Sequence, residues 1–339
     1  MAPVRVAAVQ VGSVAFDLAA SIGKLEDYVA TAAQGGAKLV VFPEAYLSAY
    51  PRFLSFEIGR RTDENRHWYK QYVWSSMKVP DGAEGFDWLS TEAGSESAGR
   101  EFESFRKLCQ IAKKHNVFLS VGIVERSIVG ATLFCSNILI DSNGVLLSKH
   151  RKLMPTAAER VVWGTSSATN QPAFLGTDHK PTDNLPVVWC PSLGFRIGGN
   201  ICWENYCPLQ RYALYRKGVS LYLAPTADAR PTWLPSMQHI AMEGRTFVVS
   251  ANQFQKASDF PEDYPARVAA GGKDEVWSRG GSCVVSPLGE VLAGPLWDEE
   301  GIIYADIDSD DILGAKLDMD CAGAGHYARE DVFKFDIRT

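Results

Sequence analysis

The spacing of apolar residues along the chain switches between the periods of a β-strand and of an α-helix. Residues 4–10 form a continuous apolar, β-rich run, which predicts a buried strand. From Asp17, a residue type that caps helices, apolar residues recur at helical spacing until the glycines at 35–36 end the pattern. Residues 38–42 predict the next strand. This strand–helix–strand order favours two parallel strands joined by a right-handed crossover.

The rest of the chain continues this order and adds antiparallel strands. Turn residues at 142–144 separate the β-rich segments 133–141 and 145–149, which predicts a hairpin. Further strands are predicted at 117–124, 186–190, 195–202, 219–224, 246–251, 281–287, 291–293 and 301–308, and helices at 102–112, 208–217 and 236–244. Since no repeat or linker interrupts it, this order favours one mixed α/β domain over residues 1–339, with a long surface loop near 165–184. Two domains divided at that loop are the alternative.

The composition excludes several classes of protein. The 339 residues are 46% hydrophobic, and 34 Lys and Arg against 40 Asp and Glu give a net charge of -6, which argues against a basic nucleic-acid-binding surface. No apolar run approaches the roughly 18 residues that span a bilayer, and residues 1–10 lack the apolar core of a secretory signal. Seven cysteines without a CxxC pair are typical of free thiols in a reducing compartment. We therefore expect a cytoplasmic protein that binds neither nucleic acid nor a membrane.

Common catalytic motifs are absent from the sequence. It holds no GxSxG elbow, GxxxxGK[ST] loop, HExxH pair or GxGxxG turn after a strand, which argues against serine hydrolases, P-loop enzymes, zincins and dinucleotide-binding enzymes. The spacing of Cys190, Cys202 and Cys207 does not fit a zinc site, and no His pair accompanies them. We expect neither a metal ion nor a cofactor.

Three reactive side chains follow predicted strands. Cys202 lies where a strand ends and a helix is about to begin, and the dipole of that helix is expected to favour a thiolate. Glu44 and Lys152 each come just after another apolar strand, where burial would raise the pKa of the glutamate. Such strand ends form the active-site edge of α/β sheets. The alternatives are a packing cysteine, a solvated glutamate and one member of a solvated basic run.

Three motifs resemble the Glu, Lys and Cys motifs of the nitrilase superfamily, in that family's order. They are Phe42-Pro43-Glu44, Arg151-Lys152-Leu153-Met154-Pro155 and Cys202-Trp203-Glu204-Asn205. The resemblance continues through 208–209, 242–248, 250–253 and 325–329, and so covers almost the whole chain. It implies a single carbon-nitrogen hydrolase domain, folded as a four-layer αββα sandwich. Residues 46–51 and 202–206 are more similar to nitrilases than to the amidase, carbamoylase or cyanide-hydratase branches.

The resemblance also implies roles for individual residues. Cys202 would be the nucleophile, Glu44 the general base and Lys152 the cation that stabilises the developing anion. Glu159 matches a second glutamate that positions the lysine and the substrate. The implied reaction is hydrolysis of an organic nitrile to a carboxylic acid and ammonia. An amidase acting on small amides and a cyanide hydratase are the alternatives, whereas a catalytically silent scaffold is disfavoured because Glu44, Lys152 and Cys202 are all present.

Several neighbouring residues have two interpretations each. Tyr50, Trp163 and Trp203 are expected to line the substrate pocket, although aromatic packing would explain them too. Glu204 is expected to support the junction around the nucleophile rather than to react. His150 would allow a Cys/His site, which we rank below the glutamate because no further histidine motif accompanies it.

The chain departs from the nitrilase pattern in two places. The segment 165–184 is longer than the usual connection between the lysine and cysteine motifs, and Cys207 stands where methionine is usual. The other five cysteines are expected to be packing residues: Cys109, Cys135, Cys190, Cys283 and Cys321. The family resemblance further implies pairing of protomers through the helix after the nucleophile, and hence a homodimer or a higher homo-oligomer.

Overall fold

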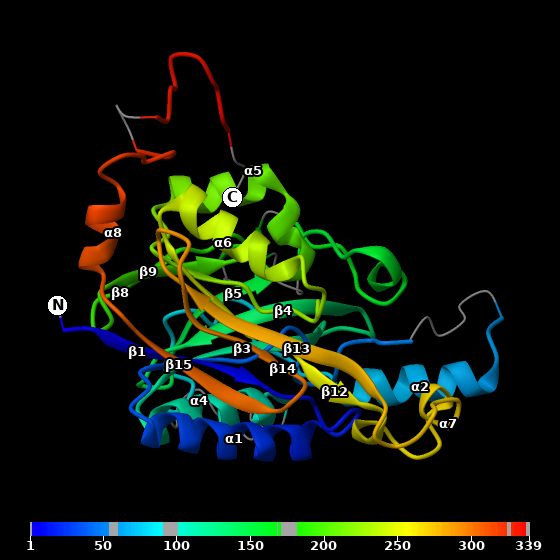
Figure 1. Ribbon diagram of the computed structural model, residues 1–339. Coiled ribbons are helices and arrows are strands. Elements are labelled where there is room, and N and C mark those ends of the chain that lie inside the picture. Colours follow the sequence, from blue (N-terminus) through cyan, green and yellow to red (C-terminus); the bar gives the residue numbers. More distant parts are fainter. Residues whose placement is uncertain are drawn as a thin grey trace.

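The computed structural model describes residues 2–53, 60–90, 101–167, 169–170, 182–323 and 327–336. In this part of the chain, two main β-sheets are stacked face to face, and helices cover their outer faces (Figure 1). The arrangement is an α/β sandwich of four layers, helix, sheet, sheet and helix, and it confirms the fold class. Most of the loop expected near 165–184, and part of the motif at 325–329, lie outside the described residues.

The first sheet has the strand order β15-β1-β2-β3-β4-β5. Its strands are β1 (Val4–Gln10), β2 (Leu39–Val41), β3 (Phe118–Arg126), β4 (Leu133–Ile140), β5 (Leu146–Arg151) and β15 (Gly301–Ile307). β1 and β2 are parallel, and β4 and β5 form an antiparallel hairpin, so both predicted pairings are confirmed. β15 returns from the far end of the chain and pairs antiparallel with β1, with Arg5 opposite Asp306.

The second sheet has the order β12-β13-β11-β10-β9-β8, and β14 pairs with β13. Its strands are β8 (Val188–Cys190), β9 (Phe195–Gly199), β10 (Leu221–Leu223), β11 (Phe247–Ser250), β12 (Phe254–Lys256), β13 (Val276–Val285) and β14 (Val291–Trp297). The central strands β9, β10 and β11 are parallel. A separate short pair is formed by β6 (Thr169–Asn170) and β7 (Thr182–Asp183).

Helices cover the outer face of each sheet (Figure 1). Helices α1 (Leu18–Gln34) and α4 (Glu103–His115) lie on the first sheet, and α5 (Pro208–Arg216) and α6 (Trp233–Gly244) lie on the second. The remaining helices are α2 (Asp63–Trp74), α7 (Pro265–Val268) and α8 (Asp310–Ala315). Asp17 caps α1 as predicted, because its carboxylate accepts a hydrogen bond from the Ala20 amide at 2.9 Å. No helix in the described ranges combines the length and the apolar composition that crossing a membrane requires.

The alternation of side chains along a strand explains why β2 is apolar throughout. Successive side chains of a strand point to opposite faces of the sheet. In β2, Val40 packs under α1, whereas Leu39 and Val41 pack between the sheets against Leu221 and Phe247. Both faces of β2 are therefore buried, and none of its positions is polar.

Two glycines allow the backbone segments around the site to approach closely. A Cβ atom added to Gly122 of β3 would lie 2.1 Å from the carbonyl oxygen of Pro43. One added to Gly199, the last residue of β9, would lie 1.9 Å from the carbonyl oxygen of Leu223. Any larger residue would displace the segment that carries Glu44 or the end of β9 that leads to Cys202.

Candidate active site

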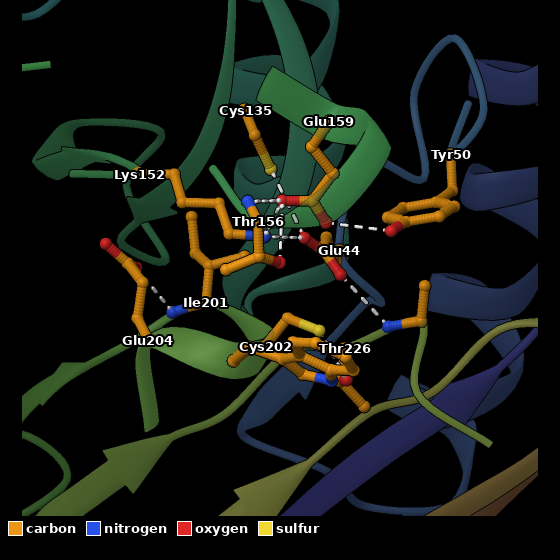
Figure 2. Close-up of polar contacts among 12 residues, drawn as sticks. Glu44, Tyr50, Cys135, Lys152, Thr156, Glu159, Ile201, Cys202, Glu204 and Thr226 are labelled. Atoms are coloured by element: carbon orange, nitrogen blue, oxygen red, sulfur yellow. Dashed lines mark hydrogen bonds and ion pairs between the residues drawn. The ribbon is translucent and has the colours of Figure 1, made fainter. Parts of the chain in front are cut away.

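Glu44, Lys152, Glu159 and Cys202 meet at one end of the sandwich. Glu44 follows β2, Lys152 follows β5 and Cys202 follows β9. Figure 2 shows the side chains of Glu44, Lys152 and Glu159 pointing toward one another above Cys202. All four residues are at least 96% buried. The structure therefore brings together the four residues that the sequence predicted to be catalytic.

Lys152 lies between two carboxylates. Its Nζ donates to Glu44 Oε1 at 2.7 Å and to Glu159 Oε2 at 2.8 Å. Glu159 is itself fixed in the 3₁₀ turn 157–161, where its Oε2 accepts the Thr156 amide at 2.7 Å and its Oε1 accepts the Tyr50 hydroxyl at 2.8 Å. Each oxygen of Glu159 thus has a partner, and the ammonium group is held at a defined position.

Burial and the neighbouring charges have opposing effects on the pKa values of Glu44 and Lys152. Burial raises the pKa of Glu44, and the carboxylate of Glu159 adds to the increase while Lys152 opposes it. Burial alone would lower the pKa of Lys152, but the surrounding negative charges, with Glu44 the strongest, together outweigh it and raise this pKa well above its ordinary value. Lys152 therefore stays protonated, and Glu44 has the raised proton affinity that suits a general base.

Cys202 occupies a strained backbone position next to Glu44. Its φ of 51° lies in the left-handed region, which is uncommon for non-glycine residues and recurs at active sites. Its amide donates to the carbonyl of Pro225 at 2.9 Å, and its Sγ accepts a hydrogen bond from the Thr226 hydroxyl at 3.2 Å. An interaction with the thiol also lowers the pKa of Glu44, as expected for a carboxylate that contacts it.

The expectation that a helix dipole favours the thiolate is wrong. The residues after Cys202 form a 3₁₀ turn, and α5 begins only at Pro208. Burial raises the pKa of Cys202 well above its ordinary value, and the negative charge of Glu44 raises it further. The resting nucleophile is therefore a thiol, and it needs a neighbouring base to become reactive.

The segment after β10 contributes contacts that sequence reasoning missed. Besides the hydrogen bond from Thr226 to the Cys202 sulfur, the amide of Ala227 donates to Glu44 Oε2 at 3.0 Å. Cys135, expected only to pack, lies with its Sγ 3.7 Å from Glu44 Oε1. The available sequence signal for the first two was the polar stretch directly after a predicted strand; Cys135 offered none, because it lies inside the strand β4.

Glu204 joins the lysine and cysteine segments. Its Oε1 accepts the amide of Leu153 at 2.6 Å, and its Oε2 accepts the amide of Ile201 at 3.0 Å and lies 2.9 Å from His150 Nε2. Burial would raise the pKa of Glu204, but the His150 imidazole outweighs it and the pKa is lowered. His150 contacts Glu204 and the Asn184 carbonyl. These contacts fit a supporting role for both residues.

Glu204→Gln is expected to destabilise the protein by about 3 kcal/mol, because an amide cannot accept from both backbone donors and leaves His150 without its charged partner. The midpoint of urea unfolding, followed by tryptophan fluorescence, measures the loss. Glu26→Gln is the matched control: Glu26 pairs with Lys114 at the surface, and its loss should lower stability by less than about 1 kcal/mol. Equal unfolding midpoints for the two variants would contradict the inference that Glu204 holds the segments of Lys152 and Cys202 together.

A cavity of about 480 Å³ opens beside the nucleophile. Cys202, Glu159, Tyr50 and Trp203 are among its lining residues, so two of the three predicted pocket aromatics lie at its surface. Trp163 is not among them. It is buried behind Tyr50, with ring centroids 5.6 Å apart, and Lys152 Nζ lies 5.5 Å from its ring.

Neither a cluster of metal ligands nor a disulfide bond is present in the described part of the chain. Within the ranges that the structure describes, no three His, Cys, Asp or Glu side chains cluster so that they could hold a metal ion. All seven cysteines are free thiols, and Cys207 is partly exposed.

Comparisons with known proteins show which family this chain belongs to. Residues 5–316 match the family model described as carbon-nitrogen hydrolase. An arylacetonitrilase from Trametes versicolor is 38% identical over 99% of this chain and 97% of its own. An aliphatic nitrilase from Sinorhizobium fredii is 40% identical over 99% and 96%, and nitrilase 3 from Arabidopsis thaliana is 40% identical over 98% and 86%.

Solved structures show the same fold. The crystal structure of an amidase from Nesterenkonia sp. is similar with a TM-score of 0.59 at 19% sequence identity, covering 92% of this chain and 93% of the amidase. The match of residues 5–316 to the family model and the relatives near 40% identity lead to one conclusion. The chain belongs to the carbon-nitrogen hydrolase family.

Proposed function

We propose that this protein is a nitrilase, which hydrolyses an organic nitrile to the carboxylic acid and ammonia. One observation carries the proposal: a buried thiol adjoins a carboxylate of raised pKa and a lysine held between two glutamates, at the wall of an open cavity. Relatives named as nitrilases match this chain over nearly its full length and support a nitrile as the substrate.

The first chemical step joins the substrate to Cys202. Glu44 takes the thiol proton, and the sulfur adds to the nitrile carbon while one electron pair of the triple bond moves to nitrogen. Lys152 stabilises the resulting charge and protonates the nitrogen, giving a thioimidate. The proton on Glu44 then passes to Lys152, which leaves Glu44 free to act as a base again. In the later steps, protons that Glu44 takes from water reach the departing nitrogen by the same path. Its position between Glu44 and Glu159 keeps it charged for this role.

Water completes the reaction in two additions. Glu44 removes a proton from the first water, which adds to the thioimidate and forms a tetrahedral intermediate. Loss of ammonia leaves a thioester, which a second water hydrolyses to the carboxylic acid and the free thiol. If the tetrahedral intermediate loses the thiol instead, an amide is released. Glu159 and Tyr50 would keep Lys152 in place throughout.

A product assay tests the activity. Purified protein is incubated with aliphatic, arylaceto- and aromatic nitriles and with the matching amides, and acid, amide and ammonia are quantified together. We expect kcat/KM for the best nitrile to exceed that for its amide by about tenfold or more. The reverse order would identify an amidase, and formamide as the product from cyanide would identify a cyanide hydratase.

The assembly and the cellular compartment stay predictions. We propose a homodimer or higher homo-oligomer that pairs through α5, and the exposed side chains of Leu209 on α5 and Met242 on α6 are consistent with such a contact. A cytoplasmic location rests on the sequence alone.

A further inference from the structure

A half-buried arginine in the cavity wall lacks a carboxylate partner. Arg52 lines the cavity beside Cys202. Its Nε donates to Gln255 Oε1 at 3.1 Å and its Nη2 to the Ala227 carbonyl at 2.7 Å, so both acceptors are neutral. Among the residues that the structure describes, none accepts a hydrogen bond from Nη1. Burial lowers the pKa of this guanidinium, although the charge of Glu44 partly opposes the effect.

The other arginines of the cavity wall are neutralised directly. Arg230 pairs with Asp228 at 2.5 Å, and Arg279 pairs with Asp298 at 2.6 Å. No such neighbour is available to Arg52, because the oxygens of Glu44 are already bound by Lys152 and the Ala227 amide. The guanidinium of Arg52 therefore lines the cavity without an ion-pair partner in the described residues.

Two buried hydrogen-bond donors near Arg52 are also unused. Ser278 lines the cavity, is 2% exposed, and has a hydroxyl without a partner in the described part of the chain. Gln255, which is fully buried and accepts from Arg52, likewise leaves its Nε2 unpaired within those residues. Gln255 and Ser278 lie directly opposite each other in the antiparallel pair β12–β13, so their side chains share one face.

Arg52, Gln255 and Ser278 form what we call the donor cluster. Arg52 and Ser278 line the cavity, and Gln255 is hydrogen-bonded to Arg52. Buried polar groups normally find partners, so the unused donors of Arg52 and Ser278 in the cavity wall indicate that a ligand supplies the acceptors. The ligand should be anionic, since a neutral acceptor would leave the half-buried charge of Arg52 without a counter-ion. A carboxylate offers two acceptor oxygens in the geometry that a guanidinium matches.

We propose that the donor cluster binds a carboxylate of the substrate, so that the preferred nitriles are cyano-carboxylates. This inference rests on the proposed nitrilase function and adds the substrate class to it. Arg52 and Cys202 line the same cavity, so one molecule reaches both, with its nitrile carbon at the sulfur and its carboxylate at the guanidinium. Arg52 is then a specificity-determining residue rather than a participant in the bond-breaking steps.

The test compares charged nitriles with neutral counterparts of the same length. The pairs are 4-cyanobutanoate with pentanenitrile, 5-cyanopentanoate with hexanenitrile, and 4-(cyanomethyl)benzoate with 4-methylphenylacetonitrile. For the best pair, we expect kcat/KM of the wild-type protein to be about tenfold or more higher for the carboxylate. Arg52→Gln should lower that ratio about tenfold or more, and Ser278→Ala about threefold. Arg279→Gln is the comparison variant and should keep the ratio within about twofold, because Asp298 already neutralises Arg279.

The ratio of kcat/KM for the charged nitrile to kcat/KM for its neutral counterpart distinguishes a loss of specificity from a general loss of activity. If Arg52→Gln slows both members of every pair equally, the arginine only supports the structure and the inference is overturned. A wild-type protein that hydrolyses every neutral nitrile at least as well as its charged counterpart also overturns it, while leaving the proposed function intact. Absence of hydrolysis for all nitriles would instead reject the proposed function itself. Should Arg52→Gln not fold, an unchanged ratio in Ser278→Ala overturns the inference.

Discussion

Cys202→Ala is expected to abolish nitrile hydrolysis, with kcat lowered by at least about 10⁴-fold. Cys202 combines a left-handed backbone conformation with a hydrogen bond to its sulfur and a neighbouring base, and alanine removes the atom that bonds to the substrate. Ammonia release measures the loss of turnover. Intact-protein mass spectrometry during turnover should show a covalent adduct on the wild-type chain and none on the variant.

Cys207→Ala is the matched control for this experiment. Cys207 is the nearby, partly exposed thiol, and no hydrogen bond joins it to the catalytic trio in the described residues. Its replacement should leave kcat within about twofold of wild type, as for most surface substitutions. Turnover above trace level in Cys202→Ala would reject the nucleophile assignment.

Glu44→Gln is expected to lower kcat by about 10²- to 10⁴-fold. The amide can still accept the hydrogen bond from Lys152, but it cannot take a proton from a thiol whose pKa burial has raised. The same loss prevents activation of water in the later steps. Rapid-quench mass spectrometry measures formation of the first covalent adduct separately from its hydrolysis.

The decisive comparison for Glu44 is the rate of that first adduct. If the Gln variant forms it at the wild-type rate, Glu44 does not deprotonate Cys202. Glu26→Gln, a surface carboxylate change, serves again as the control and should leave both rates unchanged. A slower first adduct with intact folding would support the general-base role.

Much of the fold could be predicted from local patterns. The helical spacing after Asp17, the hairpin turn at 142–144 and the parallel pair β1–β2 all follow from periodicity and turn chemistry, which act over a few residues. The pairing of β15 with β1 could not be predicted in this way. An apolar strand sequence specifies which faces are buried, and says nothing of which distant strand lies beside it.

The catalytic residues were predictable because they lie in short motifs, whereas their surroundings were not. The thiolate expectation for Cys202 failed because the sequence did not reveal the 3₁₀ turn before α5, nor how deeply burial would penalise the charge. Cys135 contacts Glu44 only because β4 passes beneath it. Arg52 was missed because its lack of a charged partner is a property of three-dimensional packing, although a lone arginine beside Tyr50 and Pro51 was visible in the sequence.

The pairing of β1 with β15 also has a consequence during translation. Arg5 and Asp306, which bond across these strands, are 301 positions apart, so the ribosome releases nearly the whole polypeptide before this edge of the first sheet can close. Until then the backbone N–H and C=O groups on that side of β1 have no strand to pair with, and such edges associate readily with one another. Chains that terminate before Gly301 should therefore aggregate even though they contain Glu44, Lys152 and Cys202.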